Sequence, residues 1–400
     1  MRKILFLGTH GQKNWGDELL LHVFMNRLLG VADRFYVNSY DPALTTAYLD
    51  RPDVTVFNTR TDRFKLLSYL ISCDAIVFGG GNILKELYTE YGGSRYATLG
   101  MIDGLTRVAR LLGKPIYLCN IGIGPVESER GRDMVTRIVQ RARLTTVRDS
   151  ESRMVLASLP ITTPYALTSD AVWATNRAYF NLPSLRPKRQ IKNAGDARTI
   201  GINLCRNISN NSNWSYFLQQ LANDVTRLHH QNPRLRFVGI PMQFDVASNN
   251  DSAALQQLTD MIHAAAPGVH FEIAAPKSLK ALAATIESLD VMLAERLHAL
   301  ILSLIVGVPV VALEYDVKVS GLVKDLGLHG QGIDINAAFQ PGSFFDAVTG
   351  ICTNYKQAEA TVAEIYEANH ERSTASFANL NAALTPEAET PEPQFIEEQS

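Results

Sequence analysis

The feature that most constrains this chain is a regular alternation of short apolar runs with longer segments of helical spacing. The runs are continuous rather than interrupted at every second position, which is typical of parallel strands buried on both faces. The longer segments place apolar residues three and four positions apart, as amphipathic helices do. The alternation therefore predicts parallel sheets covered by helices on both faces. The strands expected first are 4–8, 35–38, 54–57, 75–78, 116–121 and 144–147, with helices at 17–30, 96–113 and 131–142.

A basic, proline-containing segment at 183–198 divides this alternation in two. It holds two prolines, a glycine and five basic residues, which predicts a linker between domains. We expect an α/β fold of two doubly wound, Rossmann-like domains facing a cleft, at 1–182 and 199–340. Residues 341–385 should form C-terminal helices that pack back across the domains, and the Pro/Glu-rich 386–400 a disordered acidic tail. The strands expected after the linker are 199–204, 236–241, 269–273, 291–294 and 310–313, with helices at 214–231, 253–266, 278–288 and 297–305.

Composition excludes several classes of protein. The 38 Lys and Arg residues nearly balance 40 Asp and Glu, so no global charge favours nucleic-acid binding. No apolar stretch approaches the roughly 20 residues of a membrane span, and the N-terminal run is too short for a signal peptide core. We therefore expect a cytoplasmic chain. The cysteines lie far apart and form no ligand pattern, so we expect neither disulfides nor a metal site; they are Cys73, Cys119, Cys205 and Cys352.

A glycine-containing loop at 8–18 follows the first expected strand. The carboxyl ends of strands in open α/β sheets are where ligands bind, and Asn14 and Asp17 offer polar contacts there. The loop has neither a phosphate-binding lysine motif nor a dinucleotide glycine pattern. Helix capping by Asn14 or Asp17 is the alternative interpretation.

Two further glycine-rich loops, 79–82 and 122–125, end the next expected strands of the sheet. Glycines there let the backbone approach a ligand or a neighbouring helix closely. Gly80, Gly81 and Asn82 are the candidate contacts. Both loops should lie at the same edge of the sheet.

Four basic side chains and one histidine form the candidate anion-binding set. Arg296 and His298 stand where a strand should pass into a helix, whose free backbone N–H groups favour an anion. Lys318 lies beyond the following strand, and Arg206 follows strand 199–204. Arg148 ends a strand of the first domain and could bind a carboxylate or phosphate, or simply pair with the adjacent Asp149. The polar residues 242–245 and 249–251 could bind ligand or form a solvated loop, and we favour the loop.

Several of these motifs occur in one order that resembles the polysaccharide pyruvyl transferase family. The resemblance spans about residues 1–330 and implies a two-domain, glycosyltransferase-B-like fold. The motifs are Asn14-x-Gly16-Asp17-Glu18, Gly79-Gly80-Gly81-Asn82, Gly122-x-Gly124, Arg148-Asp149-x-x-Ser152, Arg296-Leu297-His298, and Gly307-Val308-Pro309 followed by Tyr315-Asp316-x-Lys318.

The resemblance implies transfer of the carboxyethylidene group of phosphoenolpyruvate to two hydroxyls of a sugar. The acceptor would belong to a cell-surface or exported polysaccharide precursor, the product would be a pyruvate ketal, and phosphate would leave. No cofactor is implied. Arg296 and His298 would hold the donor together with an earlier arginine, for which Arg206 and Arg148 both qualify.

The chemistry suits these residue types. Arginine and lysine neutralise the carboxylate and phosphate of phosphoenolpyruvate, with Lys318 at the departing phosphate. His298 is the expected general acid, and Asp17 would accept a hydroxyl proton. The expected acceptor-binding residues are Asn14, Asp17, Gly80, Gly81 and Asn82.

Two other functions fit the same pattern. A glycosyltransferase with a nucleotide-sugar donor could contact a ribose or the donor sugar through Glu295 and Glu314. A non-catalytic protein could use the cleft to bind an anionic sugar. A lipid-linked acceptor would bring the chain to the inner face of the membrane, where the basic segment 183–198 could make a peripheral contact. Nothing in the sequence indicates an oligomeric state.

Overall fold

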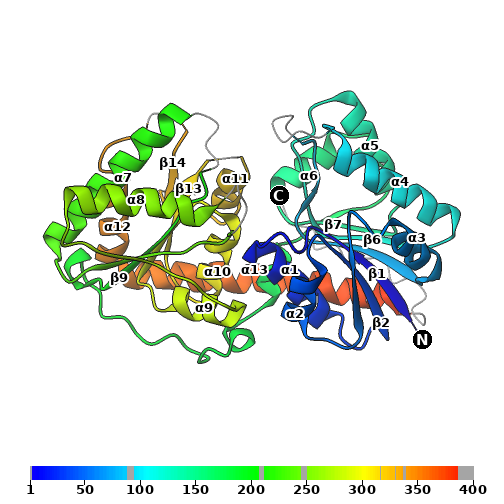
Figure 1. The fold of residues 1–400 in the computed structure, drawn as a ribbon, viewed down its shortest axis with the longest axis horizontal. Helices are drawn as coiled ribbons and strands as arrows, with labels where there is room; N and C mark the ends of the chain where they lie inside the picture. The colour runs from blue at the N-terminus through cyan, green and yellow to red at the C-terminus, as the bar shows by residue number, and fades with distance from the viewer. Residues whose placement is uncertain are drawn as a thin grey trace. The chain divides into compact units, whose positions relative to one another are not determined.

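Two compact units make up the chain in this computed structural model (Figure 1). Unit 1 comprises Met1–Gln12, Asp17–Ala174 and Asn369–Ser400, and unit 2 comprises Lys13–Gly16 and Thr175–Ala368. The structure describes residues 2–87, 94–206, 211–244, 250–315, 317–328, 330–336 and 339–385, without the side chains of residues 211, 212, 317 and 318.

Unit 1 is built on a parallel sheet of strand order β3-β2-β1-β4-β6-β7-β8, with β5 paired to β6. Helices α4 and α5 lie on one side of this sheet, and α1 and α2 lie on the other (Figure 1). Its strands are β1 (Lys3–Leu7), β2 (Arg34–Ser39), β3 (Val54–Asn58), β4 (Ala75–Gly79), β5 (Asn82–Leu84), β6 (Ile116–Ile123), β7 (Leu144–Val147) and β8 (Ala166–Leu167). Its helices are α1 (Trp15–Arg27, which begins in unit 2), α2 (Pro42–Leu49), α3 (Arg63–Ser72), α4 (Ala97–Leu111), α5 (Glu129–Arg141) and α6 (Ser150–Ala157), with a 3-10 turn at Ala171–Ala174.

Unit 2 is built on a second parallel sheet, of order β11-β10-β9-β12-β13-β14. Helices α7, α8 and α12 share one apolar core with this sheet. Its strands are β9 (Thr199–Asn203), β10 (Arg236–Gly239), β11 (His270–Ile273), β12 (Val291–Ala294), β13 (Val310–Glu314) and β14 (Gly332–Asp334). Its helices are α7 (Asn211–Gln231), α8 (Asp251–Ala265), α9 (Leu279–Glu287), α10 (Leu297–Ile305), α11 (Val317–Asp325), α12 (Ser343–Thr353) and the first part of α13 (Tyr355–Leu384), with 3-10 turns at Arg177–Phe180 and Ala194–Asp196.

The segment 183–198 differs from the solvated linker that its composition suggests. Ile191, Ala194 and Ala197 are buried in the core of unit 2. Arg186 donates hydrogen bonds to the carbonyl of Gly307 (2.8 Å) and to the hydroxyl of Tyr355 (3.1 Å). Because its apolar side chains are buried and its arginine is bonded internally, the segment packs as part of unit 2.

The compact units also begin and end at other residues than the expected domains. The break near the middle of the chain falls between Ala174 and Thr175, before the basic segment. The C-terminal helix α13 is continuous, yet its residues 355–368 belong to unit 2 and its later residues belong to unit 1. All four cysteines are buried and unpaired by disulfides. Among the described helices, none combines the length and hydropathy of a membrane-spanning segment.

Candidate functional site

The strand-to-helix junction at Arg296 is built by a fully apolar strand followed by a nearly all-apolar helix. Strand β12 is buried along its whole length, and seven of the nine residues of α10 are buried. Between them Arg296 is extended, with φ −87° and ψ 133°, and its backbone N–H donates to Asn203 Oδ1 at 2.9 Å. Gly307, with φ 89°, ends the helix in a conformation that suits glycine. The chain therefore presents Arg296 and His298 at a helix N-terminus, as expected.

A buried carboxylate fixes the guanidinium of Arg296. Arg296 Nε lies 2.8 Å from Asp251 Oδ2, and a terminal nitrogen lies 2.6 Å from Asp251 Oδ1. Asp251 is fully buried and also accepts the backbone N–H groups of Met242 (2.8 Å) and Gln243 (3.1 Å). Burial opposes the charge on Arg296, but neighbouring Cys205 and the Asp251 carboxylate hold the pKa of the guanidinium above its ordinary value.

The expectation that the run 242–251 is a solvated loop is therefore wrong for Asp251. This carboxylate lies at the start of α8, where it satisfies two backbone donors and one arginine. Its partner Arg296 is 45 residues away in the chain, so the local polar composition gives no signal of the pairing. Residues 245–249 lie outside the described residues.

A second buried carboxylate lies beside the first. Glu295 is fully buried, and its Oε2 accepts the backbone N–H of Cys205 at 2.6 Å. Asn203, also fully buried, donates from Nδ2 to the carbonyl of Ile240 at 2.8 Å. These contacts tie together the carboxyl ends of strands β9, β10 and β12, which neighbour one another in the sheet.

The segment Lys13–Gly16 packs on this same edge of unit 2. The backbone N–H of Trp15 donates to the carbonyl of Met242 at 2.8 Å, and Asn14 forms an antiparallel bridge with Gln243. A Cβ at Gly16 would overlap the imidazole of His298. Asn14 was expected on the acceptor side of the first domain, but these backbone contacts place it in unit 2 with Arg296 and His298.

Two other basic residues of unit 2, Arg206 and Lys318, were predicted to bind the anion. The structure describes the side chain of Arg206 but not that of Lys318. Arg206 follows β9 and is exposed, with a left-handed φ of 51°. The backbone of Lys318 lies in the first turn of α11, and its side chain is outside the described residues.

Arg148 lies in unit 1 and is bound internally. Its Nη1 lies 2.8 Å from Asp170 Oδ2 and its Nε 3.3 Å from Asp149 Oδ2, and only 6% of its side chain is exposed. Burial opposes the charge on Arg148, but Asp170 and Asp149 hold its pKa above the ordinary value. Arg148 therefore belongs to unit 1, whereas Arg206 belongs to unit 2.

The predicted acceptor residues of unit 1 gather around the end of β1. Thr9 Oγ1 donates to Asp17 Oδ1 at 3.2 Å, and a Cβ at Gly81 would lie 3.3 Å from the same hydroxyl. Gly80 packs against Leu20 of α1, so helix packing accounts for at least one of the glycines. Asn82 donates from Nδ2 to the carbonyl of Gly124 at 2.7 Å, which links the two glycine-rich loops.

Two buried titratable residues in this loop were not among the predicted site residues. Glu18 is 1% exposed, its Oε1 accepts the N–H of Gly11 at 2.7 Å, and burial raises its pKa to about 7. His10 is 2% exposed, stacks on Phe6, and has its pKa lowered by burial to about 4. Glu18 belongs to the motif that begins at Asn14. That motif is the sequence signal from which Glu18 could have been predicted as a site residue. Within the described residues, no group of three or more His, Cys, Asp or Glu is arranged to hold a metal ion.

Comparison with solved structures shows the fold class. A putative UDP-N-acetylglucosamine 2-epimerase from Listeria monocytogenes is 12% identical, with a TM-score of 0.60 over 96% of this chain and 95% of that one. Alr3699/HepE from Anabaena, solved with UDP, is 16% identical, with a TM-score of 0.57 over 96% of this chain and 99% of that one. At these identities the likeness is one of fold, and it confirms the expected pair of doubly wound, glycosyltransferase-B-like domains.

Comparison by sequence identifies the family. The amylovoran biosynthesis protein AmsJ of Erwinia amylovora is 38% identical over 72 residues, which are 18% of this chain and 17% of that protein. The family model for polysaccharide pyruvyl transferases matches residues 14–317, from Asn14 to just beyond β13. Because that match covers most of the chain, this protein belongs to the polysaccharide pyruvyl transferase family and is a transferase.

Proposed function

We propose that this protein transfers the carboxyethylidene group of phosphoenolpyruvate to two hydroxyls of a saccharide in a polysaccharide precursor. The proposal rests on family membership together with one observation: the junction of β12 and α10 holds Arg296, fixed by Asp251, two residues before a histidine packed on Gly16. A fixed cation beside a proton donor at a helix N-terminus suits a donor that carries a carboxylate and a phosphate.

Arg206 is our choice for the second donor arginine. It follows β9, the strand paired to β12, and its side chain is exposed. Arg148 is held by two carboxylates in unit 1, whereas the side chain of Arg206 is exposed. We assign Lys318 to the departing phosphate on its place in the sequence, two residues into the helix that follows β13.

In the proposed reaction His298 protonates the methylene carbon of phosphoenolpyruvate. The resulting oxocarbenium-like carbon is attacked by one sugar hydroxyl, whose proton passes to Asp17. The second hydroxyl then replaces phosphate, which leaves with the remaining proton. One C–H and two C–O bonds form, while the C=C π bond, two hydroxyl O–H bonds and the C–O bond to phosphate break. The proton held by Asp17 returns to His298 through solvent, so the step balances without an oxidant. Asp17 follows Gly16 directly in the chain, although the two residues belong to different units.

A nucleotide-sugar glycosyltransferase is the alternative, and one observation weighs against it. For that function Glu295 and Glu314 are the expected contacts to a ribose or the donor sugar, and the structure bears on the first of them. Glu295 is fully buried and already accepts the N–H of Cys205, so its carboxylate is used inside the sheet edge.

Thermal unfolding with candidate donors tests the proposal. Phosphoenolpyruvate at about 100 times its Kd should stabilise the folded chain by roughly 2.7 kcal/mol, and UDP should not. Arg206→Ala should remove the shift, whereas Arg234→Ala, which truncates another exposed arginine of unit 2, should keep it. Stabilisation by UDP with none by phosphoenolpyruvate would favour the glycosyltransferase. Phosphate release and a ketal methyl signal in NMR, with the native acceptor glycan, complete the test.

A further inference from the structure

Exposed apolar side chains are concentrated on two helices of unit 1. Among the described residues, eleven large hydrophobic side chains are exposed, and α3 and α4 carry six of them. We call these six the α3–α4 surface. A concentration of exposed apolar side chains marks an interaction surface more often than scattered ones do. Its members are Phe64, Leu67, Ile71, Met101, Val108 and Leu111.

The α3 side chains form one stripe. Phe64, Leu67 and Ile71 are 91%, 48% and 54% exposed and follow one another at intervals of three and four residues, which puts them on one side of a helix. The core side of the same helix is formed by Leu70, which is buried, and Leu66, which packs against the core. The helix thus has apolar residues on the side facing water as well as on the side facing the sheet.

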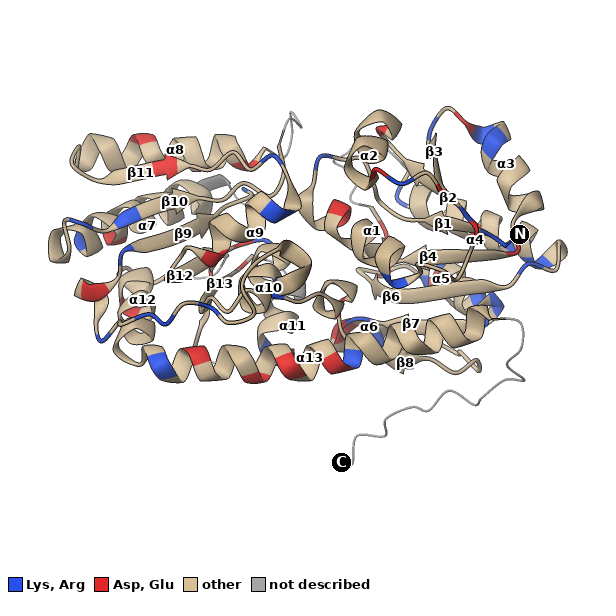
Figure 2. Cartoon of the chain, turned by 90° about the horizontal axis from the view of Figure 1, so that it is seen from below, with Lys and Arg blue, Asp and Glu red and all other residues tan. Residues whose placement is uncertain are grey.

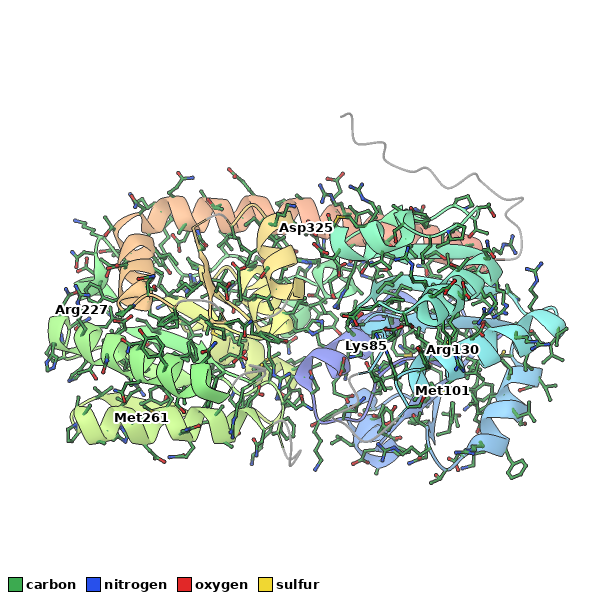
Figure 3. All side chains as sticks on the ribbon, turned by 90° about the horizontal axis from the view of Figure 1, so that it is seen from above. Lys85, Met101, Arg130, Arg227, Met261 and Asp325 are labelled. Atoms are coloured by element: carbon green, nitrogen blue, oxygen red, sulfur yellow. The ribbon has the colours of Figure 1, made fainter. Side chains whose placement is uncertain are left out.

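The α4 side chains repeat this arrangement. Met101 (labelled in Figure 3), Val108 and Leu111 are 45%, 37% and 79% exposed at intervals of seven and three residues. A Cβ added at Gly104, which lies on the same side of the helix, would meet no atom within 4 Å. Nothing in the described part of the chain covers this side of α4.

The two stripes lie on helices that cover the same side of the unit 1 sheet. Both helices pack on the same apolar core, to which α3 contributes Leu70 and α4 contributes Ile102. Lys114, just after α4, donates from Nζ to the carbonyl of Cys73 at the end of α3, at 2.7 Å. The C-terminal ends of the two helices are therefore linked through Lys114.

Basic residues flank these stripes. Arg63 and Lys65 lie on either side of Phe64, and Arg107 and Arg110 lie on either side of Val108, all four exposed. Figure 2 shows Lys and Arg along α3. Asp62, the residue just before the helix, pairs with Lys65 (Nζ–Oδ2 3.1 Å), so among the described residues Arg63 is the unpaired charge that flanks this stripe. The acidic residue of α4, Asp103, is bound by Arg137 and Arg141 of α5.

We propose that the α3–α4 surface binds an anionic phospholipid bilayer. Apolar side chains at helical intervals with cationic flanks are the arrangement that enters the headgroup region of a membrane, where each basic residue adds attraction to anionic lipid. The net charge of the whole chain is only −2, so the attraction is local to this face. In the segment 183–198, the other candidate for a membrane contact, Arg186 is bonded internally. The proposal does not depend on the identity of the donor.

Vesicle sedimentation of the full chain tests it. We expect binding to phosphatidylcholine vesicles containing 30% phosphatidylglycerol and much weaker binding to phosphatidylcholine alone. The double variant Phe64→Ser, Leu111→Ser should bind at least about tenfold more weakly. The matched control is Leu185→Ser, Tyr216→Ser, which removes two exposed apolar side chains of unit 2 (83% and 45% exposed) and should bind like the unchanged chain.

Two matched double variants that reverse charge separate the electrostatic contribution to vesicle binding from the apolar contribution. Arg107→Glu, Arg110→Glu should abolish the preference for phosphatidylglycerol, whereas Arg234→Glu, Lys280→Glu, with the same charge change on unit 2, should not. Raising salt from 0.1 to 0.5 M should weaken binding of the unchanged chain because the Debye length shortens. All four variants should keep the thermal shift with phosphoenolpyruvate, so failure of this proposal is distinguishable from failure of the proposed function.

Three outcomes would overturn the proposal. The first is no sedimentation with either vesicle. The second is an equal loss of vesicle binding in Phe64→Ser, Leu111→Ser and in its unit 2 control, Leu185→Ser, Tyr216→Ser. The third is a dimer, measured by light scattering, that Phe64→Ser, Leu111→Ser dissociates while lipid binding stays absent, which would assign the face to a second copy of the chain.

Discussion

Arg148 in unit 1 and Arg296 in unit 2 each follow a strand of their sheet, and each pairs with a buried aspartate. They differ in what surrounds the pair. Arg148 contacts two carboxylates and is 6% exposed, whereas Arg296 is 12% exposed and pairs with Asp251. Only Arg296 has a histidine two residues further along, packed on Gly16 from the far N-terminal end of the chain.

The difference teaches that an arginine at a strand end does not by itself mark a ligand site. Both arginines are buried, charged and bonded, and burial with a paired carboxylate is also a structural arrangement. The distinguishing features of the unit 2 site are a titratable neighbour and a segment, Lys13–Gly16, that belongs to unit 2 although it is separated from it in sequence.

The largest expected effect that tests the difference between the Arg148 and Arg296 sites is at His298. His298→Asn should lower kcat by about 10²- to 10⁴-fold, because it removes the proposed general acid, with little change in the unfolding midpoint. His263→Asn is the control in unit 2: that ring lies 3.2 Å from the carbonyl of Val269, far along the chain from the junction. Phosphate release at an unchanged rate in His298→Asn would remove the distinction between the two arginines.

Removing each aspartate sharpens the comparison further. Asp251→Asn should cost about 3–5 kcal/mol in the free energy of unfolding, because it leaves a buried guanidinium without its carboxylate. Asp170→Asn should cost less, because Asp149 remains 3.3 Å from Arg148. Urea unfolding measures both. Equal losses would mean that Asp149 contributes nothing to holding Arg148.

Glu18 offers a carboxyl whose charged neighbours are Asp17 and Asp41 rather than an arginine. Burial raises its pKa from 4.5 to about 7, so the folded chain keeps this proton over a pH range where the unfolded chain has lost it. Its contribution to stability is therefore fully present below about pH 4.5 and is lost as the pH rises through 7.

Glu18→Gln, which stays neutral, should accordingly be more stable than the unchanged chain by roughly 2–3 kcal/mol at pH 8 and about equally stable at pH 4.5. Thermal or urea unfolding across this pH range measures the difference. Glu272→Gln, at a surface carboxylate 52% exposed, is the control and should show no such trend. A constant difference from pH 4.5 to 8 would contradict a raised pKa.

The smallest expected effect is the difference in stability between alanine substitutions at two glycines, Gly16 and Gly104. Gly16→Ala should destabilise unit 2 by about 1–3 kcal/mol, because its Cβ would overlap the His298 ring, and should also reduce turnover. Gly104→Ala, on the open side of α4, should stabilise by roughly 0.5–1 kcal/mol, because alanine suits a helix interior better. Destabilisation by both would argue that glycine conformation, rather than contact with His298, explains Gly16.

The sequence predicted the fold class because continuous apolar strands and amphipathic helices are local patterns. Strand 144–147 and helix 297–305 match the structure to the residue. Helix α3 was not predicted, and its exposed Phe64 and Leu67 obscure the usual polar side of a helix. The two-residue β8 and three-residue β14 are too short for any periodicity.

The candidate site was predictable only where neighbours in sequence are neighbours in space. Arg296 and His298 share one junction, so a local motif reveals both. The pairing of Arg296 with Asp251 and the packing of Gly16 on His298 join residues that are far apart in the chain. Such contacts follow from the tertiary fold, and composition gave the opposite expectation for Asp251.

Helix α13 determines when unit 1 can complete its folding during synthesis, because the end of this helix belongs to unit 1. Its buried Phe377 packs on Phe24 with ring centroids 4.9 Å apart, and Asn381 donates to the carbonyl of Arg27. Unit 1 thus contains strand β1, which is translated before residues 175–368 of unit 2, and the end of α13, which is translated after them. Unit 2, which ends at Ala368, has all its residues before unit 1 does. During translation the side chain of Phe24 therefore lacks its contact with Phe377 until all the residues of unit 2 have been synthesised. Unit 1 can complete its packing only after that point.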